Sequence, residues 1–283
     1  MSQFLPLTSD HDALVAAQAE GVALCTLVGL EGSFSRRIGA QLAVMPDGRT
    51  VGSLSDGCLE KQLAAEARTA SAPKLLRYGA GSPQIDFRLP CGSGVDVLID
   101  PAPDRDACRA AVAQLAARRP ACLALPSPEG MLAERHYMPL LQLALFGEGP
   151  ELESLHRLAR NCGIATQVFG KNEPQRLALG RAPEGAQVDR WTAIVLLFHD
   201  HEWEAAILEW ALGTEAFHIG AQGGKAARED RLALLAARGV EPAALARIRS
   251  PIGFISHARD PGVLALSVLA EVVGEYEQLH PHG

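Results

Sequence analysis

The spacing of apolar residues changes near the middle of the chain, and the first part has short apolar runs separated by turn residues. Such runs predict buried strands, and Pro46-Asp47-Gly48 between two of them predicts a hairpin. We predict strands at residues 22–28, 41–45, 50–53, 74–78 and 95–100, and helices at residues 9–20, 55–70 and 104–119. This part is therefore expected to be mixed α/β.

The second part alternates regularly between apolar runs and helical segments. Strands are predicted at residues 140–146, 164–169, 191–198 and 217–220, and helices at residues 151–162, before residue 212, at residues 223–238 and from Pro261 onward. Asp260 is expected to cap the last helix. Strands that alternate with helices form a parallel sheet covered by helices. The predicted fold class is α/β, with a mixed α/β N-terminal domain and a Rossmann-like C-terminal domain.

A predicted hairpin at residues 121–125 and 131–137 separates the two patterns. We expect the domain boundary just after it, near Met138 and Pro139, which gives domains at residues 1–138 and 139–283. A chain of 283 residues has the right length for two modest domains.

Composition and charge exclude several classes of protein. The chain is 48% hydrophobic and 21% charged, as in ordinary globular proteins. Its net charge of -7 argues against general nucleic-acid binding. The N-terminal residues do not have the pattern of a signal peptide, and no apolar stretch is long enough to cross a membrane. We therefore predict a cytoplasmic protein that binds neither nucleic acid nor membrane.

Six cysteines are spread along the chain, and none forms a C-x-x-C pair. A structural zinc site is therefore not predicted, and reduced thiols are expected in the cytoplasm. Four of them fall in strand or helix patterns and are predicted to pack in the interior: Cys25, Cys108, Cys122 and Cys162. The other two, Cys58 and Cys91, lie in glycine-rich loops.

A series of short motifs in the first part resembles the N-terminal domain of the XdhC/CoxI family. In order, they are Glu31-Gly32-Ser33, Arg37-Ile38-Gly39-Ala40, Pro46-Asp47-Gly48, Val51-Gly52-Ser53, Gly57-Cys58-Leu59-Glu60 and Cys91-Gly92. Near the other end, Ser250-Pro251-Ile252-Gly253 and residues 265–271 are similar to the C-terminal end of the same family. The resemblance covers nearly the whole chain, and its specificity comes from the order and spacing of motifs that are weak individually.

The resemblance implies an accessory protein rather than an enzyme. Members of this family bind molybdenum cofactor, a molybdopterin-type ligand, and protect it while a terminal sulfur is installed. They then deliver it to a xanthine dehydrogenase-type molybdenum hydroxylase. The implied partners are that hydroxylase, a cysteine desulfurase as sulfur source, and a second copy of the chain in a homodimer.

Three residues of the first part have the chemistry to hold such a cofactor. Cys58 is expected at a helix N-terminus, which favours a thiolate, and a thiolate is a soft donor for molybdenum. Cys91 is a candidate second ligand. Arg37 has a guanidinium suited to the phosphate of molybdopterin. The alternative is that both cysteines are small buried hydrophobes and that Arg36 and Arg37 are solvated surface residues. Glu60 is expected to cap the helix that begins near Cys58, with orientation of a ligand amine as the alternative.

The second part has a glycine loop in the position of a dinucleotide-binding loop. Gly147 and Gly149 follow a predicted strand and precede a helix, so their amides are candidates to bind a phosphate. However, Leu152 occupies the third glycine position, and Glu148 and Glu151 bring negative charge. No acidic residue directly follows Phe169 to bind a ribose hydroxyl. Tight NAD(P) binding is therefore not predicted.

Two further segments follow predicted strands of the second part. His199-Asp200-His201 is a candidate contributor to a site, or a solvated turn with Asp200 as a helix cap. Gly223-Gly224-Lys225 is a basic turn suited to an anion.

The leading hypothesis is a cofactor chaperone whose ligand lies in a cleft between the two domains. Cys58, Cys91 and Arg37 would line one side, and the Gly147–Gly149 loop, His199 and Lys225 the other. One alternative is an NAD(P)-dependent oxidoreductase, which rests on the glycine loop alone. Another is a ligand-free interaction protein that docks the target enzyme.

Overall fold

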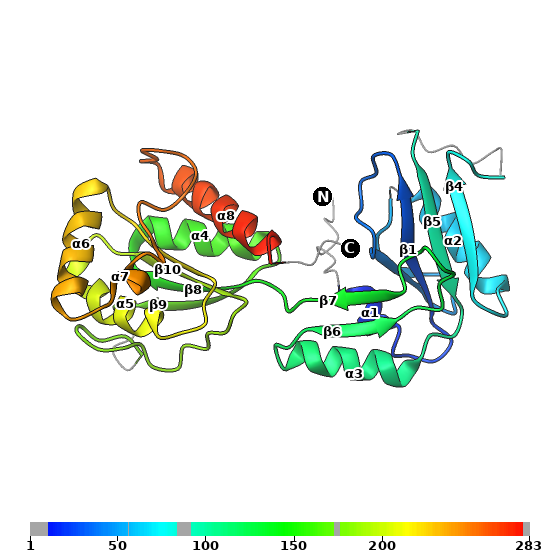
Figure 1. The fold of residues 1–283 in the computed structure, drawn as a ribbon, viewed down its shortest axis with the longest axis horizontal. Coiled ribbons are helices and arrows are strands. Elements are labelled where there is room, and N and C mark those ends of the chain that lie inside the picture. Colours follow the sequence, from blue (N-terminus) through cyan, green and yellow to red (C-terminus); the bar gives the residue numbers. More distant parts are fainter. Residues whose placement is uncertain (1–10, 56, 84–91, 173–175, 280–283) are drawn as a thin grey trace. The chain divides into compact units, whose positions relative to one another are not determined.

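A computed structural model describes residues 11–55, 57–83, 92–172 and 176–279 of the chain (Figure 1). The chain divides into two compact units, with the division between Pro139 and Leu140. We call them the N-terminal unit and the C-terminal unit. Among the described residues, no helix is both long enough and apolar enough to cross a membrane.

The N-terminal unit is built on a five-stranded antiparallel sheet in the order β3-β2-β1-β5-β4. Its strands are β1 (Ala23–Glu31), β2 (Gln41–Val44), β3 (Thr50–Gly52), β4 (Lys74–Gly79) and β5 (Gly94–Asp100). Each of them was predicted from an apolar run. The hairpin expected at Pro46-Asp47-Gly48 is present, since β2 and β3 pair antiparallel with Val44 opposite Thr50.

Helices cover both faces of this sheet. Successive residues of a strand point to opposite faces, so apolar residues on both faces can be buried. Cys25 and Leu27 of β1 pack in one core with α2 (Cys58–Thr69). The intervening Leu24 packs in a second core with α1 (Asp12–Ala16) and α3 (Arg105–Ala116).

The prediction that the first helix continues to residue 20 was wrong. Helix α1 ends at Ala16, and the next turns are tighter, with the N–H of Ala19 donating to the carbonyl of Ala16.

The hairpin β6 (Ala121–Ala124) and β7 (Glu134–Tyr137) forms a separate two-stranded sheet. It is shorter than predicted, because Leu132 donates a hydrogen bond to the carbonyl of Val28 on β1 at 3.1 Å instead of continuing the hairpin. Helix α3 packs against β6.

Two of the four cysteines predicted to be interior are in fact exposed. Cys25 and Cys108 are buried, as predicted, but Cys122 and Cys162 are exposed. Cys122 lies on the outward face of β6, where buried and exposed residues alternate. Cys162 is the C-cap residue of a helix, beyond its buried stripe. An apolar run or a helical period does not by itself reveal which face of an element is covered.

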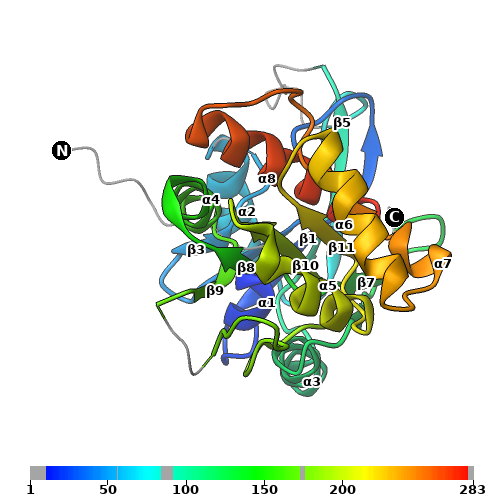
Figure 2. The same ribbon diagram turned by 90° about the vertical axis from the view of Figure 1, so that its left-hand side faces the viewer.

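The C-terminal unit contains a five-stranded parallel sheet in the order β12-β11-β10-β8-β9, which confirms the Rossmann-like prediction (Figure 2). The strands are β8 (Gln142–Gly147), β9 (Ala165–Gly170), β10 (Thr192–Leu197), β11 (His218–Ala221) and β12 (Ile248–Arg249). Four were predicted. Strand β12 was not, because two residues are too few to give a pattern.

Helices lie on both faces of the parallel sheet (Figure 1). They are α4 (Gly149–Asn161), α5 (Glu204–Leu212), α6 (Lys225–Ala237), α7 (Pro242–Leu245) and α8 (Pro261–Glu277). Helices α5 and α6 share a core with Phe146 of β8, and α4 packs against α8. Asp260 caps α8 as predicted, since its carboxylate accepts hydrogen bonds from the N–H groups of Gly262 and Val263.

The strand order of the parallel sheet indicates where a ligand would bind. The chain leaves β8 toward β9 on one side, and its later strand β10 lies on the other side of β8. Ligands of open α/β sheets bind outside the carboxyl ends of the strands at such a reversal point. In this unit that position lies at the ends of β8 and β10, where the glycine loop and His199 follow.

Candidate functional site

In the N-terminal unit, the loop that enters α2 presents an exposed thiol. Cys58 is the first residue of α2, as expected, and its side chain is a free thiol. Glu60 holds the preceding loop in place: its carboxylate accepts hydrogen bonds from the N–H groups of Leu54 at 2.9 Å, Ser55 at 2.5 Å and Gly57 at 2.8 Å. The capping role predicted for Glu60 is confirmed, and the loop before Cys58 is thereby fixed from within.

The two neighbouring arginines of the same unit, Arg36 and Arg37, have different surroundings. Arg36 is attached to the end of β3, because its guanidinium donates to the carbonyl of Ser53 at 3.3 Å and to the hydroxyl of Ser53 at 3.1 Å. The neighbouring Arg37 is exposed. The second candidate thiol, Cys91, lies outside the described residues.

In the C-terminal unit, the glycine loop is shaped by the close approach of β10. Gly147 has a φ of 149°, and a Cβ atom there would lie 2.3 Å from the carbonyl oxygen of Leu197. Gly149, with a φ of 83°, begins α4, so this helix starts two residues earlier than predicted. The loop thus directs the first amides of α4 toward the carboxyl edge of the sheet. Leu152, at the third glycine position, is buried.

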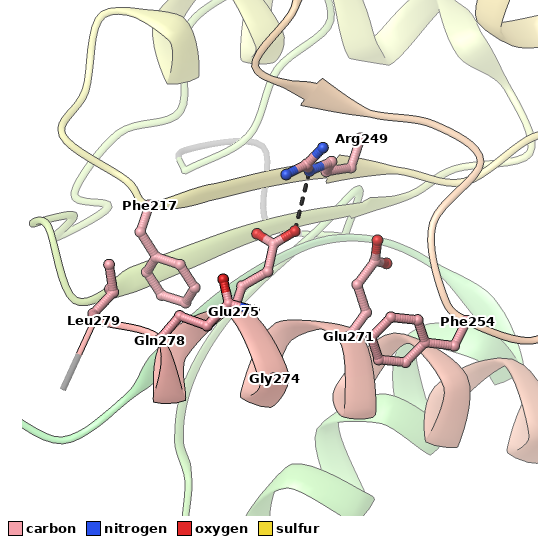
Figure 3. Close-up of a pocket in the computed structure, with 8 residues that line it drawn as sticks. All are labelled: Phe217, Arg249, Phe254, Glu271, Gly274, Glu275, Gln278 and Leu279. Atoms are coloured by element: carbon pink, nitrogen blue, oxygen red, sulfur yellow. Dashed lines mark ion pairs between the residues drawn. The ribbon is translucent and has the colours of Figure 1, made fainter. Parts of the chain in front are cut away.

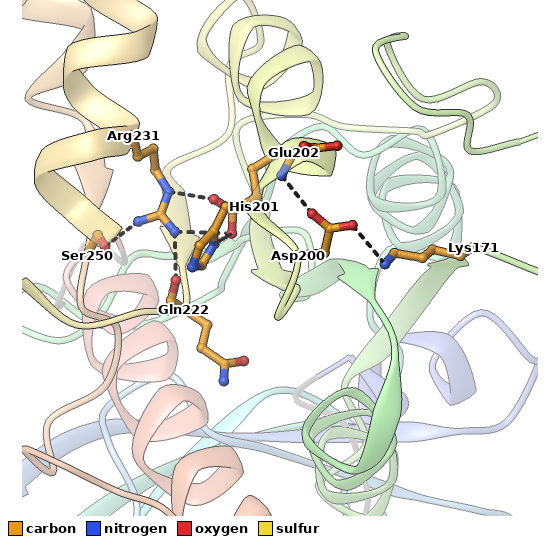
Figure 4. Close-up of polar contacts among 8 residues, drawn as sticks. Lys171, Asp200, His201, Glu202, Gln222, Arg231 and Ser250 are labelled. Atoms are coloured by element: carbon orange, nitrogen blue, oxygen red, sulfur yellow. Dashed lines mark hydrogen bonds and ion pairs between the residues drawn. The ribbon is translucent and has the colours of Figure 1, made fainter. Parts of the chain in front are cut away.

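Acidic side chains at this edge are already paired with two basic residues. The Nζ of Lys171 lies 3.8 Å from Asp200 (Figure 4). The same Nζ lies 2.6 Å from Glu148, and the Nε2 of His199 lies 3.4 Å from Glu151. Three carboxylates against Lys171 and His199 make an unfavourable surface for a pyrophosphate. The charges therefore support the prediction against tight NAD(P) binding.

Lys171 was not identified from the sequence. It directly follows β9, and its ammonium lies 5.1 Å from the centre of the Trp203 ring, a cation–π contact. In the sequence, its position directly after a predicted parallel strand could have identified it as a candidate site residue.

The two histidines that follow β10 have different partners. His199 faces Glu151 on α4, whereas the Nδ1 of His201 lies 3.1 Å from Glu204 on α5. The chain enters a 3-10 helix at His201, so the two imidazoles have different surroundings and do not converge on one metal. Asp200 accepts a hydrogen bond from the N–H of Glu202 at 3.2 Å. This is the capping alternative considered for Asp200.

A buried ion pair connects the segments that follow three of the strands. The side chains of Arg231 and Glu204 are 3% and 2% exposed, and the two are joined by hydrogen bonds of 2.8 Å and 3.1 Å. The same guanidinium donates to the hydroxyl of Ser250 at 2.6 Å and to the carbonyl of Gln222 at 2.7 Å (Figure 4). Arg231 thereby positions the loops after β10, β11 and β12. Sequence reasoning missed it because it lies within an ordinary helical pattern.

The basic glycine turn lines a pocket of about 460 Å³ in the C-terminal unit. The pocket is bounded by Gly223 and Gly224 before α6, by Pro251 and Ile252 after β12, and by Arg259 before α8. Lys225 starts α6 and contributes a side chain that is 88% exposed. Helix N-termini and basic side chains attract anions, so this pocket suits a phosphate better than the acidic glycine loop does.

A second hollow, of about 590 Å³, lies along α8 beside strand β12 (Figure 3). Its cation, Arg249, is 3.1 Å from Glu275, whose carboxylate also lies 3.0 Å from the Nδ1 of His218. With its charges satisfied internally, and Phe217 and Phe254 on its walls, this hollow has no excess positive charge for an anionic ligand.

Comparisons with known proteins agree with these observations. The chain is 32% identical to the molybdenum cofactor insertion chaperone PaoD of Escherichia coli (strain K12), over 94% of this chain and 89% of that protein. Residues 15–79 match the model of the XdhC and CoxI family, and residues 143–272 match the XdhC Rossmann domain. This chain belongs to the XdhC/CoxI family.

The ranges matched by the XdhC/CoxI family models include candidate residues of each unit. Cys58, Glu60 and Arg37 fall within the first matched range, and Gly147 and Lys225 within the second. A solved structure described as a xanthine dehydrogenase from Bacillus halodurans superimposes with a TM-score of 0.74, at 20% identity, over 97% of each chain. At this identity the match supports the fold of the XdhC/CoxI chain and not its activity.

Proposed function

We propose that this protein is a molybdenum cofactor chaperone, which binds the cofactor as cargo and delivers it to a xanthine dehydrogenase-type molybdenum hydroxylase. The observation that carries this proposal is the identity with PaoD, named as a molybdenum cofactor insertion chaperone, over nearly the full length of both proteins. A chaperone of this kind needs groups that hold the cofactor without consuming it, and both units offer them.

The exposed thiol of Cys58 is the proposed molybdenum ligand of the N-terminal unit. A thiolate is a soft donor, and the preceding loop is held by Glu60, so the sulfur has a defined position. Cys91 is proposed as the second sulfur, and Arg37 as a partner for the cofactor's phosphate. An exposed thiol can also release its ligand again, which a carrier requires.

The amides before α6 and the side chains of Lys225 and Arg259 are the proposed phosphate contacts of the C-terminal unit. They combine a helix N-terminus with two cations, and backbone amides there favour an anion. Gly147, Gly149 and His199 remain proposed contacts for the rest of the ligand, since they lie where ligands of parallel sheets bind.

Sulfuration and delivery are the finer parts of the proposal. While the cofactor is held, a cysteine desulfurase would install the terminal sulfur, and the loaded protein would then dock on its hydroxylase. We propose a homodimer as the working form. On the C-terminal unit, Phe254 and Leu266 are 69% and 56% exposed and give an apolar surface for association.

Cofactor binding provides the test. Purified protein is mixed with molybdenum cofactor under reducing, oxygen-free conditions, and molybdenum and pterin are measured in the protein fraction after gel filtration. The wild type is expected to retain both, and Cys58→Ala to retain much less. The control is Cys162→Ala, which removes another exposed thiol. Absence of binding in the wild type would refute the function, whereas unchanged binding in Cys58→Ala would refute only the ligand assignment.

A further inference from the structure

The outward face of the β6–β7 hairpin presents a thiol, a carboxylate and an imidazole close together. Cys122 lies directly opposite His136 in the strand pairing, and Glu134 is two residues before His136 on the same face. All three residues are exposed, and their candidate donor atoms lie within 4.8 Å of one another. Among the described residues, this is the one group of at least three such side chains that is close enough to hold a metal ion.

Two of the three distances between donor atoms in this group are close to those of a tetrahedral metal site. The Sγ of Cys122 lies 3.5 Å from the Oε2 of Glu134, and the Nε2 of His136 lies 3.7 Å from the same oxygen. With usual zinc–ligand bond lengths, the edges of a tetrahedron between these donors are about 3.4–3.6 Å. An ion can therefore bind without rearrangement of the strands.

The inward face of the hairpin keeps the three ligands in position. Ala121, Leu123 and Tyr137 are buried, and the hydroxyl of Tyr137 donates to the Oε1 of Gln41 at 2.6 Å. Helix α3 packs against β6. Because these contacts hold the backbone of the hairpin, metal binding restricts only the conformational freedom of the three side chains.

The residues next to the ligands leave room for an ion. Ala124 lies opposite Glu134, and its small side chain lets the carboxylate turn toward Cys122. Arg135 points to the other face, where its guanidinium lies 4.9 Å from the centre of the Tyr137 ring. This cation is thereby kept away from the ligand face.

We propose that Cys122, Glu134 and His136 form a binding site for a borderline-soft divalent transition-metal ion such as Zn²⁺. Thiolate, imidazole and carboxylate are the three kinds of ligand that zinc uses. Binding releases the thiol proton of Cys122 to solvent, and the Cys122–Glu134 hydrogen bond is replaced by two bonds to the metal. Because the face is exposed, the fourth coordination position is open to water.

This proposal does not depend on the proposed chaperone function. It concerns a different element, and the C-x-x-C criterion could not find it, since two of the ligands come from one strand and the thiol from the other. A divalent ion stabilises the thiolate form of Cys122.

Cobalt substitution provides the test. The full chain, purified without cofactor and treated with a chelator, is titrated with Co²⁺ and followed by the thiolate-to-cobalt absorption in the near ultraviolet. One site per chain is expected. Cys122→Ser should abolish the thiolate band. His136→Ala should weaken binding by more than about tenfold, since even outer-shell partners of metal sites contribute 10–100-fold. Zn²⁺ should displace Co²⁺ from the wild type.

A matched variant identifies the thiol that binds. Cys162→Ser removes another exposed cysteine and should leave the cobalt band unchanged. Thermal unfolding without metal should be alike in all variants, because the substituted side chains are exposed. A band that persists in Cys122→Ser, or one that disappears in Cys162→Ser instead, would overturn the proposal.

Discussion

Arg231 shows how a single side chain organises the carboxyl edge of the parallel sheet. Its guanidinium bonds Glu204, Ser250 and the carbonyl of Gln222, which follow different strands. A buried ion pair often adds no net stability relative to a well-packed apolar pair, but removal of one partner alone leaves the other charge in the interior without it. The loops of the proposed phosphate pocket are therefore sensitive to this contact.

Arg231→Met should lower the free energy of unfolding by about 3–5 kcal/mol, because the buried Glu204 carboxylate loses its guanidinium partner and keeps only its contact with His201. Urea unfolding followed by circular dichroism measures the effect. The matched control is Arg238→Met at the C-cap of the same helix α6, which breaks an exposed pair with Glu209 on α5 and should cost less than about 1 kcal/mol. Equal effects of the two substitutions would contradict the role of burial.

Glu275 makes the stability depend on pH. Its hydrogen bond with His218 lowers the pKa of the Glu275 carboxyl below its usual value. The ionised form is thus favoured in the folded protein, so this stabilisation is present above the unfolded-state pKa and is lost as the pH falls through the folded-state pKa. Glu275→Gln should cost about 1–3 kcal/mol at pH 7 and less near pH 3, measured by urea unfolding at both values. An equal cost at both values would contradict this assignment.

At the scale of elements, the turn from β8 to α4 is set by a backbone contact. Gly147 lies against the carbonyl of Leu197 on β10, so the glycine is required by the neighbouring strand as well as by its own φ. The same turn directs the start of α4 toward the ligand edge. The glycines of this loop therefore have a structural role whether or not the loop binds a phosphate.

Gly147→Ala should destabilise the protein by at least about 2 kcal/mol, because the new methyl group meets backbone atoms that cannot move aside. Gly224→Ala is the control, since nothing lies within 4 Å of a Cβ atom at that position. Thermal unfolding of both variants checks the difference. A Gly147→Ala protein as stable as the wild type would show that the strands separate readily at this point.

At the scale of the whole molecule, charge distribution decides which ligands are accepted. The net charge is -7, yet the pocket beside α6 combines helix amides with Lys225 and Arg259. The glycine loop, in contrast, places Glu148 and Glu151 where a nucleotide phosphate would bind in other Rossmann-like domains. The fold is thus compatible with a nucleotide, but the charges at its usual position are not.

NADH and NADPH should show no saturable binding in the micromolar range when titrated by fluorescence. The double variant Glu148→Gln, Glu151→Gln should bind them more tightly than the wild type, because the repulsion of the pyrophosphate is reduced. Saturable micromolar binding to the wild type would favour the oxidoreductase alternative over the chaperone.

The sequence by itself predicted most helices and strands of both units and their order. Apolar periodicity is a local property, and it predicted β1 to β5 and the alternation of β8 to β11 with helices. The pair Asp260-Pro261 predicted the cap of α8. The position of Cys58 at a helix start and the capping by Glu60 also follow from neighbouring residues. The family motifs led to the proposed function.

Only the tertiary structure decided which distant side chains meet. The Arg231–Glu204 pair, the contacts of Lys171, and the group of Cys122, Glu134 and His136 each join residues from different elements. Such contacts depend on strand register and on which face of each element is covered. Periodicity does not contain this information, because a shift of one residue in a strand turns every side chain to the opposite face.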